Sequence, residues 1–253
     1  MSAAAKIELR DVWKSFDGKP VLAGVDLKVM TGESLVIIGG SGTGKSVTLK
    51  CILGILHHDR GDVLIDGVPI GRLDRRGFLR HFGMLFQGGA LFDSLTVWQN
   101  VAFRRRHGRK PLPRREARDL AIEKLRRVGL GPETADLYPA ELSGGMQKRV
   151  GLARAIATDP QVIFFDEPTA GLDPIMASVI NDLIRELVSE MGATAITITH
   201  DMTTVRTVAD HVAMLHGGKV RWAGLVGEID TAGDPYLDQF IHGRAEGPIE
   251  AVR

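Results

Sequence analysis

Three features are scarce in this sequence: cysteine, long apolar runs and a surplus of charge of either sign. The one cysteine among 253 residues, Cys51, excludes an internal disulfide and is consistent with a reducing compartment. No apolar run approaches the roughly 18 residues that a transmembrane helix needs, and residues 1–6 lack the apolar core of a signal peptide. The 32 basic and 31 acidic residues nearly balance, so no net charge attracts nucleic acid. We expect contact with a membrane only through partners, and no nucleic acid partner.

The size and composition fit one large globular domain. The 44% apolar and 25% charged residues fit a globular chain rather than a disordered one. A length of 253 residues suits one large α/β domain with an inserted subdomain. Cys51 follows the first Gly-rich segment, on a predicted helix. We expect it to be a buried core thiol rather than a reactive one.

The segment from Gly39 to Ser46 matches the phosphate-binding loop pattern, G-x-x-x-x-G-K followed by Ser or Thr. It lies between the apolar run 35–38 and a helix-like pattern, which is the strand–loop–helix setting that the motif needs. Glycines let backbone N–H groups turn toward phosphate oxygens, Lys45 supplies a positive charge, and the Ser46 hydroxyl can bind magnesium. The alternative is a Gly-rich turn, against which Lys45 and Ser46 in register argue. We predict that a nucleoside triphosphate is bound by Gly39, Gly40, Ser41, Gly42, Thr43, Gly44, Lys45 and Ser46.

Two carboxylates, Asp166 and Glu167, end a second apolar strand at 162–165. The carboxyl end of a buried strand beside a phosphate loop is where a magnesium-linked acid is expected. Glu167, one residue later, is placed to polarise a water against the terminal phosphate. Without the phosphate loop upstream, such a pair would fit an ordinary surface turn equally well.

Two further polar residues follow apolar strands. His200 comes after 195–199, and Gln87 comes after 84–86. A lone histidine there is usually structural, and the glutamine by itself means little. If parallel strands end at one sheet edge, however, His200 reaches the terminal phosphate and Gln87 reaches the metal or the attacking water.

Apolar periodicity predicts the order of the elements. Residues 7–9 and 25–29 alternate as strands do, and hairpins are predicted around 66–67 and 217–218. Between about 73 and 159 the pattern is mainly helical.

A long helix is predicted after Asp173, which caps it with Pro174 at the first position. The apolar residues that we expect this helix to bury are Val179, Ile180, Leu183, Ile184, Leu187 and Val188.

A second Gly-rich segment, residues 142–146, begins another predicted helix. We call this segment the signature loop. Ser143, Gly144, Gly145 and Met146 would form an anion cradle that contains no lysine. An ordinary helix cap is the alternative, and it would be favoured if the phosphate loop were missing.

Together these segments resemble the nucleotide-binding subunits of ATP-binding cassette (ABC) transporters, over about residues 6–225. The resemblance implies an α/β P-loop NTPase fold with a mixed-sheet core, an N-terminal antiparallel β subdomain and an inserted helical subdomain. It implies that ATP and Mg²⁺ bind between two copies of the chain, each signature loop closing on the partner's ATP. By the same resemblance, Phe16 stacks on adenine and Asp173 lies in the loop that joins the two sites. The implied catalytic residues are Glu167, His200 and Gln87, and the implied metal-binding residues are Ser46, Gln87 and Asp166.

The domain boundaries expected from the resemblance are 6–228 for the ATPase domain, with the helical subdomain inserted at about 88–160. Residues 229–253 form an extension that we expect to make a dimer contact. Its apolar residues at helical spacing cannot be buried by so short a segment alone, so docking on the neighbouring subunit is expected, with folding back on its own subunit as the alternative.

A narrower resemblance comes from residues 83–92, from Met146 in place of the usual glutamine, and from 234–248. These look like the ATPase of the Mla lipid-asymmetry systems. This resemblance implies phospholipid transport between bacterial inner and outer membranes, with the chain peripheral on the cytoplasmic face of the inner membrane. The implied partners are a second copy, an integral permease, an MCE-class substrate-binding protein and a small STAS-type accessory subunit.

Two alternatives remain at this stage: an ABC importer for another substrate, and a soluble ABC ATPase acting on nucleic acid or ribosomes. The basic residues within 104–115 are interpreted first as a solvent-exposed face of the protein. The other interpretation is that they attract anionic lipid headgroups.

Overall fold

The computed structural model describes residues 5–108 and 110–250, apart from the side chains of residues 75 and 76. Arg109 of the basic run and residues 251–253 of the predicted extension lie outside the described residues. The chain divides into two compact units, one formed by residues 1–75 and 198–253 and the other by residues 76–197.

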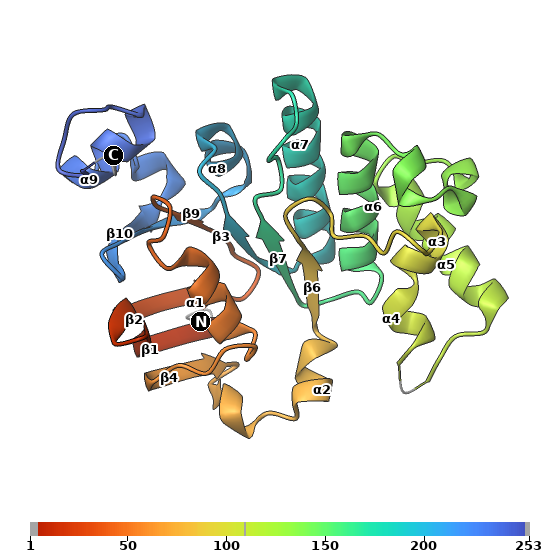
Figure 1. The fold of residues 1–253 in the computed structure, drawn as a ribbon, viewed down its shortest axis with the longest axis horizontal. Coiled ribbons are helices and arrows are strands. Elements are labelled where there is room, and N and C mark those ends of the chain that lie inside the picture. Colours follow the sequence, from red (N-terminus) through yellow and green to blue (C-terminus); the bar gives the residue numbers. More distant parts are fainter. Residues whose placement is uncertain (1–4, 109, 251–253) are drawn as a thin grey trace. The chain divides into compact units, whose positions relative to one another are not determined.

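The first unit contains most of the strands (Figure 1). Its elements are β1 (Ala5–Phe16), β2 (Lys19–Met30), β3 (Ser34–Ile38), α1 (Lys45–Ile52), β4 (Arg60–Ile65), β5 (Val68–Pro69), the 3₁₀ helix η1 (Ile70–Arg72), α8 (Met202–Val208), β9 (His211–His216), β10 (Lys219–Leu225), the 3₁₀ helix η4 (Val226–Glu228) and α9 (Pro235–His242).

Two sets of strands are paired in this unit. The antiparallel set runs β2-β1-β4-β5. In the second set β9 pairs with β10 antiparallel and with β3 parallel, so this pairing is mixed. Asp66 and Gly67 turn β4 into β5 with φ of 49° and 76°, and Gly217 and Gly218 turn β9 into β10. Both predicted hairpins are therefore confirmed.

Every residue of strand β3 is buried. Burial on both faces is typical of a strand inside a sheet that has parallel neighbours. Cys51 on α1 is fully buried, and burial raises the pKa of its thiol to about 11. The prediction of an unreactive core thiol fits this environment.

The second unit begins at the short α2 (Arg75–Leu79) and is mainly helical (Figure 1). Its other elements are β6 (Phe82–Leu85), α3 (Val97–Val101), α4 (Phe103–Arg106), α5 (Arg114–Arg127), the 3₁₀ helices η2 (Pro132–Asp136) and η3 (Pro139–Glu141), α6 (Gly144–Ile156), β7 (Val162–Asp166), α7 (Pro174–Met191) and β8 (Thr194–Ile198).

Strands β6 and β7 are parallel, with Leu85 opposite Phe165. Helix α6 packs against β6 and α7, and α3, α5 and α6 pack on one another to form the group of helices drawn in yellow and green in Figure 1. The helices that follow β6 therefore share an apolar core. Its buried side chains include Val97, Ala121 and Leu125. The inserted helical part at about 88–160 lies within this unit, but its boundaries stay a prediction.

Helix α7 departs from the sequence-based prediction at two positions. Ile180, Ile184, Leu187 and Val188 are buried as expected, but Val179 is 36% exposed and Leu183 is only half-buried, both at one open groove. Val179 neighbours Ile180 on the helix surface and turns toward this groove instead of the core. A run of consecutive apolar residues cannot all face one side of a helix, because each residue rotates the side-chain direction by about 100°.

Among the helices of residues 5–108 and 110–250, none combines the length and the apolar character that crossing a membrane requires.

Candidate nucleotide-binding and catalytic site

The phosphate loop lies in the first unit, between β3 and α1. Three of its glycines have positive φ: Gly39 at 146°, Gly42 at 75° and Gly44 at 103°. A Cβ on Gly39 would collide with the backbone carbonyl of Leu215 at the end of β9, and one on Gly44 would lie 2.7 Å from Leu22. Side chains are therefore excluded both by backbone conformation and by close neighbours.

Lys45 folds back over this loop. Its ammonium donates hydrogen bonds to the carbonyl oxygens of Gly39 at 2.6 Å and Gly40 at 2.8 Å. Helix α1 begins at Lys45, and Gly44 caps it without a side-chain hydrogen bond. The N–H groups of the first helical turn thus have no side-chain cap, and such a helix start favours an anion.

The predicted adenine-stacking residue, Phe16, ends β1 in the same unit. Its ring is 43% exposed, and the Lys14 ammonium lies 5.6 Å from the ring centroid. An exposed aromatic side chain at a strand end leaves one face available for stacking on a flat base.

His200 lies two residues after the end of β8 and is exposed. The backbone N–H of Thr199 donates to the carbonyl of Ile37 in β3 at 3.4 Å. The phosphate loop begins two residues after Ile37, and His200 is one residue after Thr199. His200 and the start of the phosphate loop therefore lie at the same edge of the strands. Asp201 then caps α8 by accepting a hydrogen bond from the Thr203 N–H at 2.9 Å.

The second unit brings Gln87, Asp166 and Glu167 to one strand edge. Since Leu85 pairs with Phe165 in parallel register, Gln87 and Glu167 both lie two residues beyond that pair. Asp166 is the last residue of β7 and is half-buried, whereas Gln87 is exposed. The parallel pairing of β6 and β7 therefore brings the ends of both strands to the same edge, and the roles expected of these side chains stay a prediction.

The backbone of Glu167 is in the left-handed region, with φ of 47°. This conformation is unfavourable for a residue with a side chain and persists only where neighbours hold it. The Glu167 carbonyl accepts hydrogen bonds from the Ala170 N–H at 3.2 Å and from the Lys148 ammonium at 3.2 Å.

The signature loop is the start of α6. Ser143 caps the helix, and its hydroxyl accepts a hydrogen bond from the Met146 N–H at 3.3 Å. Ser143 and Gly144 are exposed, and Gly145 is buried where an added Cβ would lie 2.6 Å from the Met176 side chain. The predicted helix start is confirmed, and a Ser-capped, Gly-rich helix start is compatible with anion binding, which stays a prediction.

Asp173 caps α7, with Pro174 as the first helical residue, as predicted. Its carboxylate accepts hydrogen bonds from the N–H groups of Ile175 and Met176, both at 3.0 Å. The side chain of Ile175 next to it is 78% exposed. An exposed apolar residue at this loop is compatible with a contact to another chain.

The oxygen donors predicted for magnesium are Ser46 in the first unit and Asp166 and Gln87 in the second. Hydroxyl, carboxylate and amide oxygens are the hard donors that Mg²⁺ prefers, and Mg²⁺ in such sites is usually shared with substrate phosphates. The residues present therefore fit this ion chemically. No cluster of three His, Cys, Asp or Glu side chains suited to a metal occurs within residues 5–108 and 110–250.

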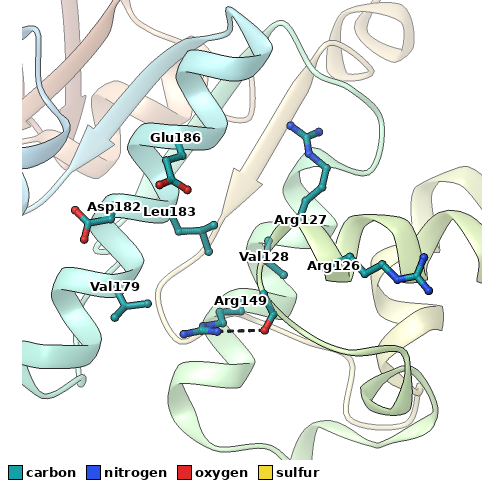
Figure 2. Close-up of a pocket in the computed structure, with 9 residues that line it drawn as sticks. Arg126, Arg127, Val128, Arg149, Val179, Asp182, Leu183 and Glu186 are labelled. Carbon is teal, nitrogen blue, oxygen red and sulfur yellow. Dashed lines mark hydrogen bonds between the residues drawn. The ribbon is translucent and has the colours of Figure 1, made fainter.

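A separate groove of about 420 Å³ lies in the second unit (Figure 2). Arginines line the side formed by the end of α5 and by α6, and carboxylates line the α7 side. Arg149 donates to the Gly129 carbonyl at 3.4 Å. None of the predicted site residues lines the groove, whose lining residues are Arg126, Arg127, Val128, Gly129, Arg149, Val179, Asp182, Leu183 and Glu186.

The sequence reasoning missed Lys148. It lies five residues after Ser143 on α6, is only 4% exposed, and contacts the backbone of Glu167. A lysine among the apolar residues of a helix that opens with an anion cradle was the available signal. Its partner is 19 residues away in sequence, so only the packing of α6 reveals the contact.

The sequence also matches known proteins. The family model described as ABC transporter matches residues 22–170. The ATP-binding protein MlaF of the intermembrane phospholipid transport system of Escherichia coli strain K12 is 38% identical over 252 residues, which cover 98% of this chain and 93% of that protein. TRIGALACTOSYLDIACYLGLYCEROL 3, a chloroplastic protein of Arabidopsis thaliana, is 41% identical, with 96% of this chain and 75% of that protein covered. A probable ribonucleotide transport ATP-binding protein, mkl, of Mycobacterium leprae is 40% identical, with 98% and 72% covered.

Solved structures match the fold as well. The dimeric ATP-binding cassette MJ0796 in a post-hydrolysis state, bound to ADP and Pi, superposes with a TM-score of 0.77 at 31% identity, covering 87% of this chain and 98% of that one. The protein cbiO1 from Clostridium perfringens, part of the transporter complex cbiONQ, gives a TM-score of 0.82 at 32% identity, covering 90% and 91%. The expected P-loop cassette fold is confirmed by these likenesses.

Proposed function

We infer, since this chain belongs to the ATP-binding proteins of the ABC transporter family, that its ATPase activity drives the transport of phospholipid. ABC cassettes hydrolyse ATP, form dimers and work with a membrane permease, and this chain is an ATPase of that class. The observation that carries the lipid proposal is the likeness to MlaF, which extends over 98% of this chain and 93% of that protein. The relative from Arabidopsis thaliana, whose name is that of a galactolipid, supports a lipid substrate independently.

The proposed roles follow the residues that match the ABC cassette motifs. In the first unit, the phosphate loop and Lys45 bind the phosphates, Phe16 stacks on adenine, and His200 contacts the terminal phosphate. In the second unit, Glu167 is the general base for the attacking water, and Gln87 helps to orient that water. Bound Mg²⁺, held by Ser46, Gln87 and Asp166, would neutralise charge on the phosphates.

We place the signature loop against the nucleotide of a second copy of the chain. Ser143 and the open N–H groups at the start of α6 suit a phosphate that Lys45 of the other copy already binds. Exposure of Ile175 beside Asp173 supports a contact between chains at this loop. Each chain then contributes to two sites, and hydrolysis requires both copies.

The proposed assembly contains an integral permease, an MCE-class substrate-binding protein and a small STAS-type subunit, with this chain peripheral on the cytoplasmic face of the bacterial inner membrane. These partners follow from the likeness to the Mla systems. The chain also resembles mkl, whose name specifies ribonucleotides. The experiment therefore compares phospholipid with ribonucleotides as the transported substrate.

The test is reconstitution of the complex that copurifies with the tagged chain from detergent-solubilised membranes. The wild-type complex should transfer labelled phospholipid between vesicles in an ATP-dependent manner, and a complex with Glu167→Gln should not. Ribonucleotide uptake without lipid transfer would instead favour the substrate that the name of mkl specifies. Copurification with ribosomes or nucleic acid in place of a membrane protein would overturn the transporter assignment.

A further inference from the structure

Helix α6 carries a buried cation that the proposed mechanism does not use. Lys148 is 4% exposed, and its ammonium donates a hydrogen bond to the Glu167 carbonyl at 3.2 Å. Burial lowers the pKa of Lys148, while the nearby carboxylates of Asp166 and Glu167 act in the opposite direction. A buried ammonium is costly unless it is paired, so this position is unfavourable for packing alone.

The peptide group that Lys148 contacts is the one that aims the Glu167 side chain. Glu167 is held at a φ of 47°, and its carbonyl is fixed from two directions, by Lys148 and by the Ala170 N–H. Since the side-chain direction of a residue follows from its backbone dihedrals, a hydrogen bond that fixes this peptide plane also fixes where the carboxylate points.

Lys148 lies near the start of α6, which is formed by the signature loop. Ser143 caps the helix, and Gly145 packs so closely on Met176 of α7 that a Cβ would lie 2.6 Å from that side chain. A helix is rigid over so few residues, so Ser143 and Lys148 move together. The start of α6 is thereby connected, within one chain, to the backbone of Glu167 and to the segment that leads from it to α7.

We propose that Lys148 is a positioning residue, which holds the Glu167 peptide from the signature helix so that the carboxylate points at the attacking water. This inference rests on the proposed role of Glu167. It predicts that loss of the ammonium lowers turnover without weakening ATP binding, because Lys148 contacts the peptide of the base and not the nucleotide.

The test compares Lys148→Met with Lys124→Met in the purified transporter complex. Lys124 is equally buried, at 4% exposed, but pairs with Asp159 at 2.8 Å. We expect Lys148→Met to lower kcat at least about tenfold, with KM for ATP changed less than about twofold. Lys148→Arg, which keeps a charged donor, should recover part of the loss, and Lys124→Met should match the wild type in kcat.

A double variant tests whether Lys148 acts through Glu167. If it does, Lys148→Met should lower kcat no further in a Glu167→Gln background, because the group that it positions is already gone. Additive losses, or a wild-type kcat for Lys148→Met, would overturn the inference. If thermal unfolding shows that Lys148→Met does not fold, Lys148→Gln takes its place in the same cycle. A wild-type complex without ATP hydrolysis would instead refute the proposed function, so the two failures are distinguishable.

Discussion

At the scale of single residues, the site depends on where a few charged groups are held. The Lys45 ammonium lies on the carbonyl oxygens of Gly39 and Gly40, so part of its hydrogen bonding must be exchanged when a phosphate arrives. Charge-assisted hydrogen bonds to phosphate are stronger than those to neutral carbonyls, and the exchange therefore favours the nucleotide.

Lys45→Ala should lower the affinity for ATP at least about tenfold, because a hydrogen bond to a charged group contributes about 1.5–3 kcal/mol. Isothermal titration of the folded chain measures this change. Lys50→Ala, at an exposed lysine in the last turn of the same helix, is the matched control and should bind ATP as the wild type does. Equal affinities for the two variants would refute the phosphate-loop assignment.

Glu167→Gln should bind ATP with nearly wild-type affinity but lose about a hundredfold or more in kcat, because an amide cannot accept the proton from water. Steady-state hydrolysis by the assembled complex measures the loss. Glu186→Gln removes an exposed carboxylate on α7 and should leave kcat unchanged. Near-normal turnover by Glu167→Gln would remove Glu167 from the mechanism.

At the scale of elements, the C-terminal helix α9 differs from what the sequence led us to expect. Leu237 is fully buried within its own unit, and the Tyr236 ring lies 4.7 Å from the His216 ring and 4.5 Å from the Arg221 guanidinium. Leu237 is therefore covered by other parts of the chain's own unit and not by a neighbouring subunit. The alternative of a tail folded back on its own subunit describes α9 in the single chain.

Leu237→Ala should destabilise the chain by about 2–5 kcal/mol, the usual cost of truncating a buried leucine. Urea unfolding measures this change. Leu225→Ala provides the control, since Leu225 is 48% exposed and its truncation should cost within about 0.5 kcal/mol. A similar small effect at both positions would mean that α9 does not pack as described.

The start of α9 should respond to acid. Burial acts to raise the pKa of Asp234, but the hydrogen bond from the Leu237 N–H and the charge of Arg221 outweigh it and lower the pKa. The lowered pKa means that Asp234 stabilises the fold above its unfolded pKa of about 4, and that this contribution is lost as pH falls through the folded value. Asp234→Asn should thus be less stable than the wild type at pH 7, with the difference shrinking below about pH 4. A difference independent of pH, in urea unfolding across that range, would contradict the ionic contribution.

At the scale of the whole molecule, the proposed function requires a second copy of the chain. Although α9 packs on its own unit, Phe240 and Ile241 remain only half-buried there, and their burial by a partner would favour assembly. The expected contact between copies through the extension stays a prediction, for which these two side chains are the candidates tested below.

Changing Phe240 and Ile241 together to serine should weaken association of the ATP-bound Glu167→Gln dimer about tenfold, a loss of about 1.4 kcal/mol. Sedimentation velocity at several concentrations measures the association. Binding of ATP to the monomer should be unaffected, which distinguishes a lost contact from misfolding. An unchanged association constant would show that the extension makes no contact across the dimer.

Much of the candidate site was predictable because its parts are contiguous in sequence. Three of these parts act through the backbone of a few neighbouring residues: the phosphate loop, the signature loop and the cap at Asp173. Their glycines and capping side chains can be recognised in the sequence without a structure. Strand pairs and hairpins were predictable for the same reason, since alternation and turn residues at 66–67 and 217–218 are local signals.

The sequence by itself thus determined the chemistry that the chain offers to a nucleotide, whereas tertiary structure decided which side chains face one another. The contact of Lys148 with the Glu167 carbonyl joins α6 to the end of β7, and the burial of Leu237 depends on how α9 packs. Arg104, part of a basic run, proves to donate to the carbonyls of Leu79 and Phe82 instead of facing solvent with its neighbours. Such contacts join segments that are distant along the chain, and packing alone selects among the partners that composition and periodicity leave open.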